Sequence, residues 1–192
     1  MISKDRQYRS FEVRAEPEGM VVEGYAAVLD SPAVMYEIDG LEYREVIDRR
    51  AFDMAQMHDV VMNFDHTGKP VARTKNGTLS LAVDDYGLKI RADLSTTQES
   101  RSLFEEIKAG LIDKMSFAFS VKDQEYDRNT RTRRITGIKR VYDVAAVSVP
   151  AYDTTSIMAR SFFEAEAEKE RAEARAALEL ALARYDYEGV KT

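Results

Sequence analysis

The chain has 192 residues, with only two histidines, His58 and His66, and no cysteine. The lack of cysteine excludes disulfides, thiolate zinc sites and a cysteine nucleophile. A serine nucleophile that works with a histidine base remains possible. That chemistry needs a hydroxyl on a rigid element, an imidazole within hydrogen-bond reach, and a third group that fixes the imidazole tautomer.

Metal and nucleotide chemistry have no matching motif. The carboxylates and the imidazole in residues 65–85 lack the spacing of a metal site such as His-Glu-x-x-His. The sequence has neither a Gly-x-Gly-x-x-Gly nor a Walker-type loop. The pair Asp84-Asp85 falls in a predicted hairpin turn, where aspartate is common for backbone reasons. We therefore expect no metal and no other cofactor.

Ser116 is the serine that best fits a nucleophile, because the alternation in "KMSFAFSV" predicts a strand. One face carries the apolar residues Met115, Phe117, Phe119 and Val121, and the other carries Ser116, Ala118 and Ser120. The apolar face would anchor the strand in the core. The small residues would leave room for a substrate or a base, although they also fit a face that packs against a covering helix.

His66 is the better candidate for the base. It follows the apolar run Val60–Phe64 in "VVMNFDHTGKP" and precedes a predicted glycine-proline turn, where a side chain can be both fixed and accessible. Taken on its own, a histidine in this position is more often a turn or capping residue than a catalytic one. His58 lies beside Asp59, on or just after a predicted helix, and is expected to be at the surface.

Short strands with turn signals dominate residues 10–157. Hairpins are predicted within 11–29 and 79–92, and a long strand or two strands within 135–153 stop at Pro150. The polar, basic-leaning stretch "KDQEYDRNTRTRR" is predicted to be a loop or a hairpin tip. One helix should be capped by Thr96 or Thr97 and stopped by Gly110, and another should begin near Arg49.

These elements predict the α+β class, with a mostly antiparallel, barrel-like sheet and helices around it. Residues from about 160 onward are rich in Ala, Glu, Arg and Leu, which predicts a charged helix. That helix could pack on its own domain or on a partner, form a coiled coil, or project into solvent. We therefore divide the chain into a domain over 1–159 and a helical tail over 160–192.

The net charge of −6 and a pI near 5.1 give no general attraction to nucleic acid or to anionic membranes. The first 19 residues have no apolar core of signal-peptide length, and no later stretch reaches about 18 apolar residues. We expect a soluble, cytoplasmic protein that binds neither nucleic acid nor membrane.

Several segments together resemble the tailed-phage prohead proteases, which mature capsids by cutting scaffold and capsid precursors. "VMNFDHTGKPVART" resembles the family's histidine segment, and "IKAGLIDKMSFAFSV" resembles the segment that contains its serine nucleophile. "VYDVAAVSVPAYDTTSI" is similar to the segment that supplies the acidic residue, and "YREVIDRRAF" is similar to an upstream segment. The segments occur in the family's order and cover roughly residues 10 to 160.

The resemblance implies that Ser116 is the nucleophile, His66 the general base and Asp143 the acid that orients the imidazole. Many relatives carry glutamate where this chain has Asp143, so Asp65 and Glu45 are kept as alternative acids. Two further departures are "VART" after the histidine segment and MSFAF in place of MSFGF. They remove no reactive group.

The resemblance also implies a fold related to the herpesvirus assembly proteases. Those enzymes use an arginine-bearing loop after the third triad member, but no clear arginine match follows Asp143. Arg133 and Arg134 precede Asp143 and are candidates only for shaping the cleft.

The implied function is a serine endopeptidase that cuts capsid and scaffold precursors inside the assembling prohead, in the host cytoplasm. It would act as a homo-oligomer and cleave itself. The alternative is a non-catalytic barrel module for virus assembly, which predicts that Ser116 and His66 are far apart or buried. A generic esterase fits less well, because the Gly-x-Ser-x-Gly elbow is absent.

Overall fold

The computed structural model describes residues 7–16, 19–148 and 157–189. Among these residues, ten strands form one sheet that carries two α-helices. The strands are β1 (Gln7–Ala15), β2 (Val21–Val28), β3 (Ala33–Ile38), β4 (Leu41–Ile47), β5 (Val61–Phe64), β6 (Thr67–Arg73), β7 (Leu79–Val83), β8 (Gly87–Asp93), β9 (Lys114–Asp127) and β10 (Thr132–Val147). The helices are α1 (Gln98–Lys108) and α2 (Ile157–Gly189).

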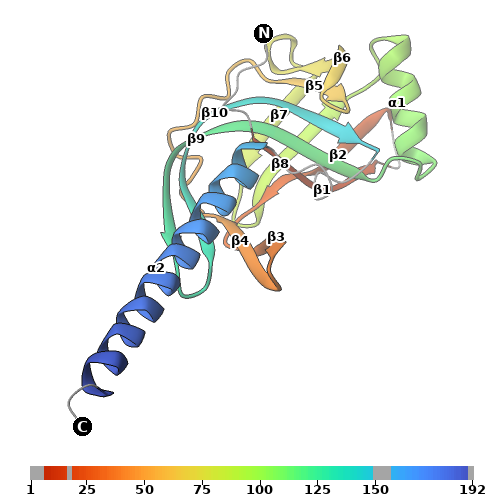
Figure 1. Cartoon of the computed structure of the whole chain (residues 1–192). Coiled ribbons are helices and arrows are strands. Elements are labelled where there is room, and N and C mark those ends of the chain that lie inside the picture. The colour runs from red at the N-terminus through yellow and green to blue at the C-terminus, as the bar shows by residue number, and fades with distance from the viewer. Residues whose placement is uncertain (1–6, 17–18, 149–156, 190–192) are drawn as a thin grey trace.

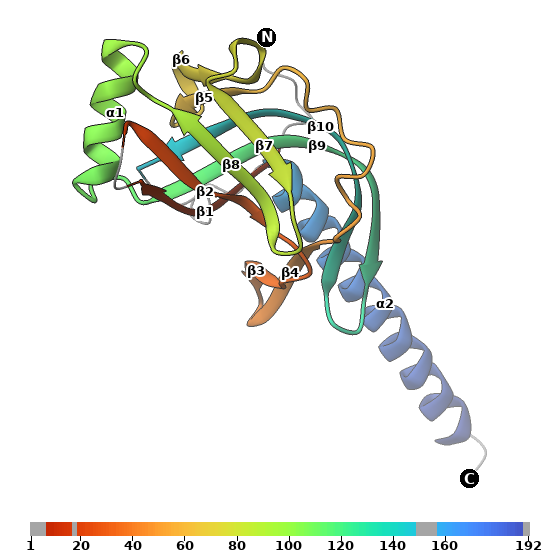
Figure 2. The same cartoon turned by 180° about the vertical axis from the view of Figure 1, so that it is seen from behind.

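The sheet is curled, and its backbone order is β3-β4-β10-β9-β1-β2-β8-β7 (Figure 1). The long strands β9 and β10 form its centre and bend strongly, which Figure 2 shows from behind. One edge of β10 pairs with β9, while its other edge pairs in parallel with β4 near its start and with β5 near its end. The remaining strand pairs are antiparallel.

The predicted α+β class and the dominance of antiparallel strands are confirmed. The sheet is a half-barrel rather than a closed barrel, since β3 and β7 end the strand order without pairing with each other. A relation to the herpesvirus assembly proteases stays a prediction.

The main core packs against one face of β9 and β10. Met115, Phe117 and Phe119 of β9 are completely buried there, and the rings of Phe117 and Phe119 stack with their centroids 4.5 Å apart. Leu103, Phe104 and Ile107 of α1 are buried in the same core. The alternation predicted for "KMSFAFSV" is thus confirmed, and it anchors the middle of β9.

Helix α1 begins and ends at the predicted signals. Thr97 caps its first turn, where the Thr97 hydroxyl oxygen accepts a hydrogen bond from the Ser100 backbone N–H at 3.1 Å. Gly110, two residues beyond the helix, has a φ of 73°, in the left-handed region that glycine tolerates. The Ser100 hydroxyl donates to the carbonyl of Val71 at 2.7 Å, which joins the helix to β6.

The helix predicted to begin near Arg49 is wrong. This segment forms consecutive tight turns, in which Ala51 N–H donates to Asp48 C=O and Ala55 N–H donates to Phe52 C=O. The segment also pairs with β10, because Gln56 forms a bridge with Arg140. Backbone bonds to the sheet therefore replace the i to i+4 bonds that a helix would need.

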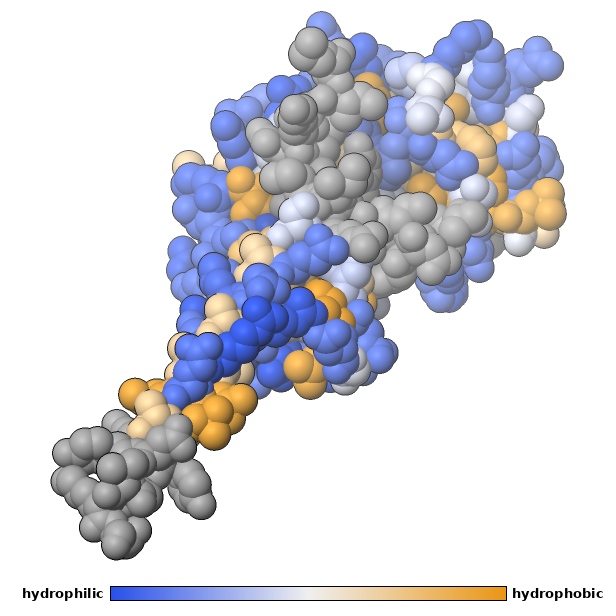
Figure 3. Space-filling model, in the orientation of Figure 1, coloured by the Kyte–Doolittle hydropathy of each residue, from blue (hydrophilic) through white to orange (hydrophobic). Residues whose placement is uncertain are grey.

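Helix α2 starts against the body and then projects away from it (Figure 1). Phe163 and Ala167 of its first half are buried in a second apolar cluster with Met35 of β3 and Tyr43 of β4. Its outer half exposes Leu178, Leu180 and Leu182, and Figure 3 shows the apolar residues gathered along this part. The two halves thus combine two of the predicted arrangements, packing on the domain and projection into solvent.

The tip of the β9–β10 hairpin, residues 128–131, also forms ion pairs with the first half of α2. Arg131 Nε lies 3.0 Å from Glu170 Oε2, and Arg128 Nη1 lies 2.8 Å from Glu173 Oε1. Of the two predictions for "KDQEYDRNTRTRR", a loop or a hairpin tip, the hairpin tip is confirmed, since β9 extends to Asp127 and pairs with β10, which starts at Thr132. β10 is a single strand, and its predicted stop, Pro150, lies outside the described residues.

Candidate active site

His66 lies at the tip of the β5–β6 hairpin. Asp65 and His66 form a two-residue turn, with φ values of 46° and 57°, between the paired residues Phe64 and Thr67. Hairpin turns with two left-handed residues match the twist of the flanking strands. The predicted glycine-proline turn is wrong, because Gly68 and Pro70 lie in β6. The turn is made by the histidine itself and the aspartate before it.

The turn is attached to the end of β10 through Asp65. The Asp65 backbone N–H donates to the carbonyl of Ala146 at 2.9 Å. The two carboxylate oxygens of Asp65 accept hydrogen bonds from the backbone N–H and the hydroxyl of Ser148, each at 2.9 Å. Asp65 therefore fixes the position of the turn and directs its carboxylate to Ser148.

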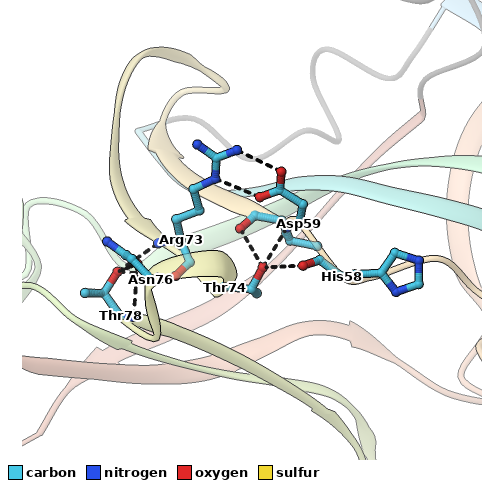
Figure 4. A network of polar contacts seen from close by, with 7 residues as sticks. His58, Asp59, Arg73, Thr74, Asn76 and Thr78 are labelled. Atoms are coloured by element: carbon cyan, nitrogen blue, oxygen red, sulfur yellow. Dashed lines mark hydrogen bonds and ion pairs between the residues drawn. The ribbon is translucent and has the colours of Figure 1, made fainter.

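A polar network fixes the open end of the same hairpin (Figure 4). The Arg73 guanidinium donates to both carboxylate oxygens of Asp59, each at 2.7 Å, and this ion pair lowers the pKa of Asp59. The Thr74 hydroxyl oxygen accepts from Val60 N–H at 3.0 Å, and its hydroxyl lies 3.3 Å from the carbonyl of His58. The His58 ring points away from these contacts (Figure 4). His58 therefore contributes through its backbone, at the end of the hairpin opposite His66.

The His66 ring meets Asp143. Its Nδ1 atom forms a short hydrogen bond with Asp143 Oδ1, across 77 residues of sequence. The His66 side chain is 16% exposed and that of Asp143 is 5% exposed. Asp143 lies on β10 beside Val61 of β5, so the strand that leads to His66 also runs past the acid.

Ser116 lies on the next strand, on the same face of the sheet as Asp143. In the β9–β10 register Ser116 pairs with Ala145 and Ala118 pairs with Asp143, and directly paired residues share a face. Ser116 is completely buried, and its Oγ has no hydrogen-bond partner among the described residues. Ser116 and Asp143 thus belong to adjacent rows of paired residues on one face of the sheet, and the Ser116 hydroxyl lies on the same face as the Asp143 carboxylate.

The alternative acid Glu45 lies far from this group. Glu45 Oε2 is 3.1 Å from Arg133 Nη1, and both side chains are almost completely buried. Arg133 is ten residues before Asp143 on β10, a separation of roughly 30 Å along a strand. Arg134 forms ion pairs with Asp30 and Asp48 in the same region. Both arginines thus form ion pairs near the start of β10, and a role for them in shaping the cleft stays a prediction.

Asn63 is a polar residue that the sequence interpretation passed over. It interrupts the apolar run of β5, is 9% exposed, and pairs with Ala145 of β10. Its Oδ1 is buried and has no hydrogen-bond partner within the described ranges. The sequence did contain a signal for Asn63, since it is a polar residue inside the short apolar run "VVMNF".

A cavity of about 840 Å³ lies between β6 and α1. The described residues that line it include Phe64, Leu103 and Leu111 but none of Ser116, His66 and Asp143. Phe64 follows Asn63 on β5 and so points to the opposite face of the sheet. This cavity is therefore separate from the His66–Asp143 pair.

A search of the described residues for groups of three or more potential metal ligands found none. The same part of the chain has no helix that is long and apolar enough to span a membrane.

Comparisons with known proteins give one match. The family model for the caudovirus prohead serine proteases matches residues 9–170. No curated protein and no solved structure matches the chain. The matched region includes the sheet, α1 and the half of α2 that packs on β3 and β4. Since the match covers most of the 192 residues, the chain belongs to the caudovirus prohead serine protease family.

Proposed function

We propose that the protein is a serine endopeptidase that cleaves scaffold and capsid precursors inside the assembling prohead of a phage. The observation that carries this proposal is the contact between His66 Nδ1 and Asp143, on the sheet face that presents Ser116. The family supports a serine peptidase in general. Ser116, His66 and Asp143 are our assignment of nucleophile, base and orienting acid.

In this mechanism the roles follow from the ring atoms. The Nδ1–H of His66 donates a hydrogen bond to the Asp143 carboxylate, which leaves Nε2 to take the proton of the Ser116 hydroxyl. The Ser116 oxygen attacks the peptide carbonyl, and His66 then gives the proton to the leaving amine. A water molecule activated by His66 hydrolyses the acyl-enzyme. Throughout, Asp143 would stabilise the imidazolium and keep its orientation.

The left-handed backbone at His66 supports its assignment. Residues other than glycine rarely have a positive φ, and such conformations cluster at functional sites. The hairpin is held at both ends, at its turn by the bonds of Asp65 with Ser148 and at its open end by the bonds of Arg73 with Asp59. A base held in this way would lose little entropy on reaching the transition state.

The test is cleavage of the phage's own capsid and scaffold precursors by purified protein. Ser116→Ala should abolish the product bands. Ser120→Ala is the matched control, because Ser120 is buried on the same face of β9 and should leave cleavage unchanged. Cleavage by the Ser116→Ala variant at the wild-type rate would refute the mechanism.

A second candidate is a non-catalytic assembly module. The observation that favours it is the complete burial of Ser116, because a nucleophile must meet its substrate. A fluorophosphonate probe separates the two candidates. Covalent labelling of wild-type protein, lost in both Ser116→Ala and His66→Gln, supports the peptidase. If the wild-type protein is not labelled and does not cleave the precursors, the result supports the assembly module.

We also propose self-processing and homo-oligomerisation. The exposed outer half of α2, which carries Leu178, Leu180 and Leu182, is the part of the described chain most open to a protease or to a second copy. Intact mass spectrometry of wild-type protein should show a shorter product that is absent from Ser116→Ala. Light scattering should give a mass above that of one 21.8 kDa chain.

A further inference from the structure

Asn63 carries a largely buried amide and is 9% exposed. Its Oδ1 is buried and accepts no hydrogen bond within the described part of the chain. Leaving a buried polar group unsatisfied costs about 1–3 kcal/mol. Native structures keep few such groups, and they often have a functional reason. Val61, two residues earlier on β5 and on the same face, is apolar, so an apolar residue at position 63 would also fit this face.

The strand register places Asn63 in line with Ser116. Asn63 of β5 pairs with Ala145 of β10, and Ala145 pairs with Ser116 of β9. All three side chains are on one face, and the backbones of the outer two are two strand spacings apart, about 10 Å. Between them the sheet presents only the methyl group of Ala145. Two buried polar atoms without partners among the described residues, Asn63 Oδ1 and Ser116 Oγ, therefore lie in one row on the same face of the sheet.

The chemistry that fits this arrangement of Asn63 and Ser116 is the stabilisation of an oxyanion. When a serine oxygen attacks a carbonyl, the carbonyl oxygen becomes negatively charged and needs a fixed hydrogen-bond donor nearby. An asparagine side chain is neutral and carries two N–H donors. A half-turn about its Cβ–Cγ bond exchanges Oδ1 and Nδ2 without changing its shape. The buried position of Oδ1 can thus equally hold a donor.

We propose that Asn63 is a catalytic residue, whose side-chain N–H donates to the oxyanion formed when Ser116 attacks the substrate. The inference rests on the proposed peptidase function and adds the donor that the Ser116, His66 and Asp143 assignment lacks. Asp143, which contacts His66, lies in the adjacent row on this face, since it pairs with Val61, two residues before Asn63. The base and the oxyanion donor therefore approach the serine from different directions.

The first experiment compares wild-type protein with Asn63→Leu and Asn63→Asp, which keep the size of the side chain and remove the donor. In precursor cleavage, kcat should fall about 100- to 1,000-fold with little change in KM. Labelling of Ser116 by the fluorophosphonate should slow as well, because the phosphoryl oxygen would occupy the same position. Unchanged kcat and labelling rate in Asn63→Leu would overturn the proposal.

A second measurement excludes a structural role. Urea unfolding should show that Asn63→Leu is as stable as the wild type or more stable, because it removes an unsatisfied polar group. The chain has only two histidines, so NMR can follow the His66 ring directly with His58 as a reference. At a fixed pH the His66 ring signals should be unchanged in Asn63→Leu. Changed ring signals, or a loss of stability that matches the loss of rate, would overturn the assignment to the oxyanion.

The two proposals fail in different ways. If wild-type protein neither labels nor cleaves, or if Ser116→Ala still cleaves, the proposed function fails. If the wild type labels at Ser116 and Asn63→Leu labels equally fast, the function stands and only the role of Asn63 fails.

Discussion

His66 Nδ1 is hydrogen-bonded to Asp143 Oδ1, although 77 residues separate the two in sequence. The parallel pairing of β5 with β10 creates this contact, because it sets Val61 against Asp143 and carries the chain on to the turn at Asp65 and His66. The competing acids are engaged elsewhere, Asp65 with Ser148 and Glu45 with Arg133.

Asp143→Asn should lower kcat by about 10,000-fold, the loss seen when the acid of a serine-protease triad becomes an amide and the histidine tautomer is wrong. The fold should be retained, since the amide has the same size. Asp143→Glu should keep part of the activity. Precursor cleavage under single-turnover conditions measures these losses.

Asp65→Asn is the matched control for that substitution, because Asp65 adjoins His66 but bonds to Ser148. We expect a small effect on kcat. A loss as large as that of Asp143→Asn would mean that the acid has been assigned to the wrong residue.

The buried pair of Glu45 and Arg133 should be sensitive to the loss of one partner. Arg133 also donates to Gln124 Oε1 at 2.8 Å and lies over the ring of Phe162, 4.8 Å from its centroid. Glu45→Gln should destabilise the fold by about 3–5 kcal/mol, because it leaves a buried guanidinium without its counter-charge. Urea unfolding measures this loss.

Replacing both partners, with Glu45→Met and Arg133→Met together, should recover much of the stability. A double variant that is as unstable as the sum of the single variants would show that the pair is not energetically coupled.

Tyr126 should make stability depend on alkaline pH. Burial, followed by the charge of Glu170, raises the pKa of Tyr126 from 10.0 to about 12. Because the folded-state pKa lies above the unfolded value, the contribution of Tyr126 is complete below pH 10.0 and is lost as the pH rises through about 12. Tyr126→Phe should show a smaller decline in unfolding free energy across this window. An identical decline in both proteins would contradict the assignment.

Phe163 should determine whether α2 stays on the body. The centroid of its ring lies 5.7 Å from the ring centroid of Tyr43 and 5.9 Å from that of Tyr36. Phe163→Ala should cost about 3–5 kcal/mol in the cluster of α2 with β3 and β4, and should make α2 easier to cleave by added trypsin. The control Leu178→Ala lies on the exposed half and should change stability by less than about 0.5 kcal/mol. Equal effects of the two substitutions would refute this packing role.

Local patterns in the sequence were sufficient for much of the fold. The alternation of Met115, Phe117 and Phe119 predicted the central strand, and Thr97 and Gly110 predicted both ends of α1. Each of these signals depends on residues that are close together in the sequence, so the sequence alone is enough to predict the element. The resemblance to the prohead proteases rests on short segments of this kind as well.

Long-range pairing decided the rest. Residues 49–55 became turns because Ala51 and Gln56 bond to β10, and the turn at His66 formed where β5 pairs with β6. The contact of His66 with Asp143, and the row of Asn63, Ala145 and Ser116, depend on which strands flank β10 and in which register. A shift of one residue would turn each side chain to the other face. Residue types and spacing therefore named the candidate serine and histidine, and the family resemblance named the aspartate. Only the assembled sheet could show which of them meet and which amide shares a row with the serine.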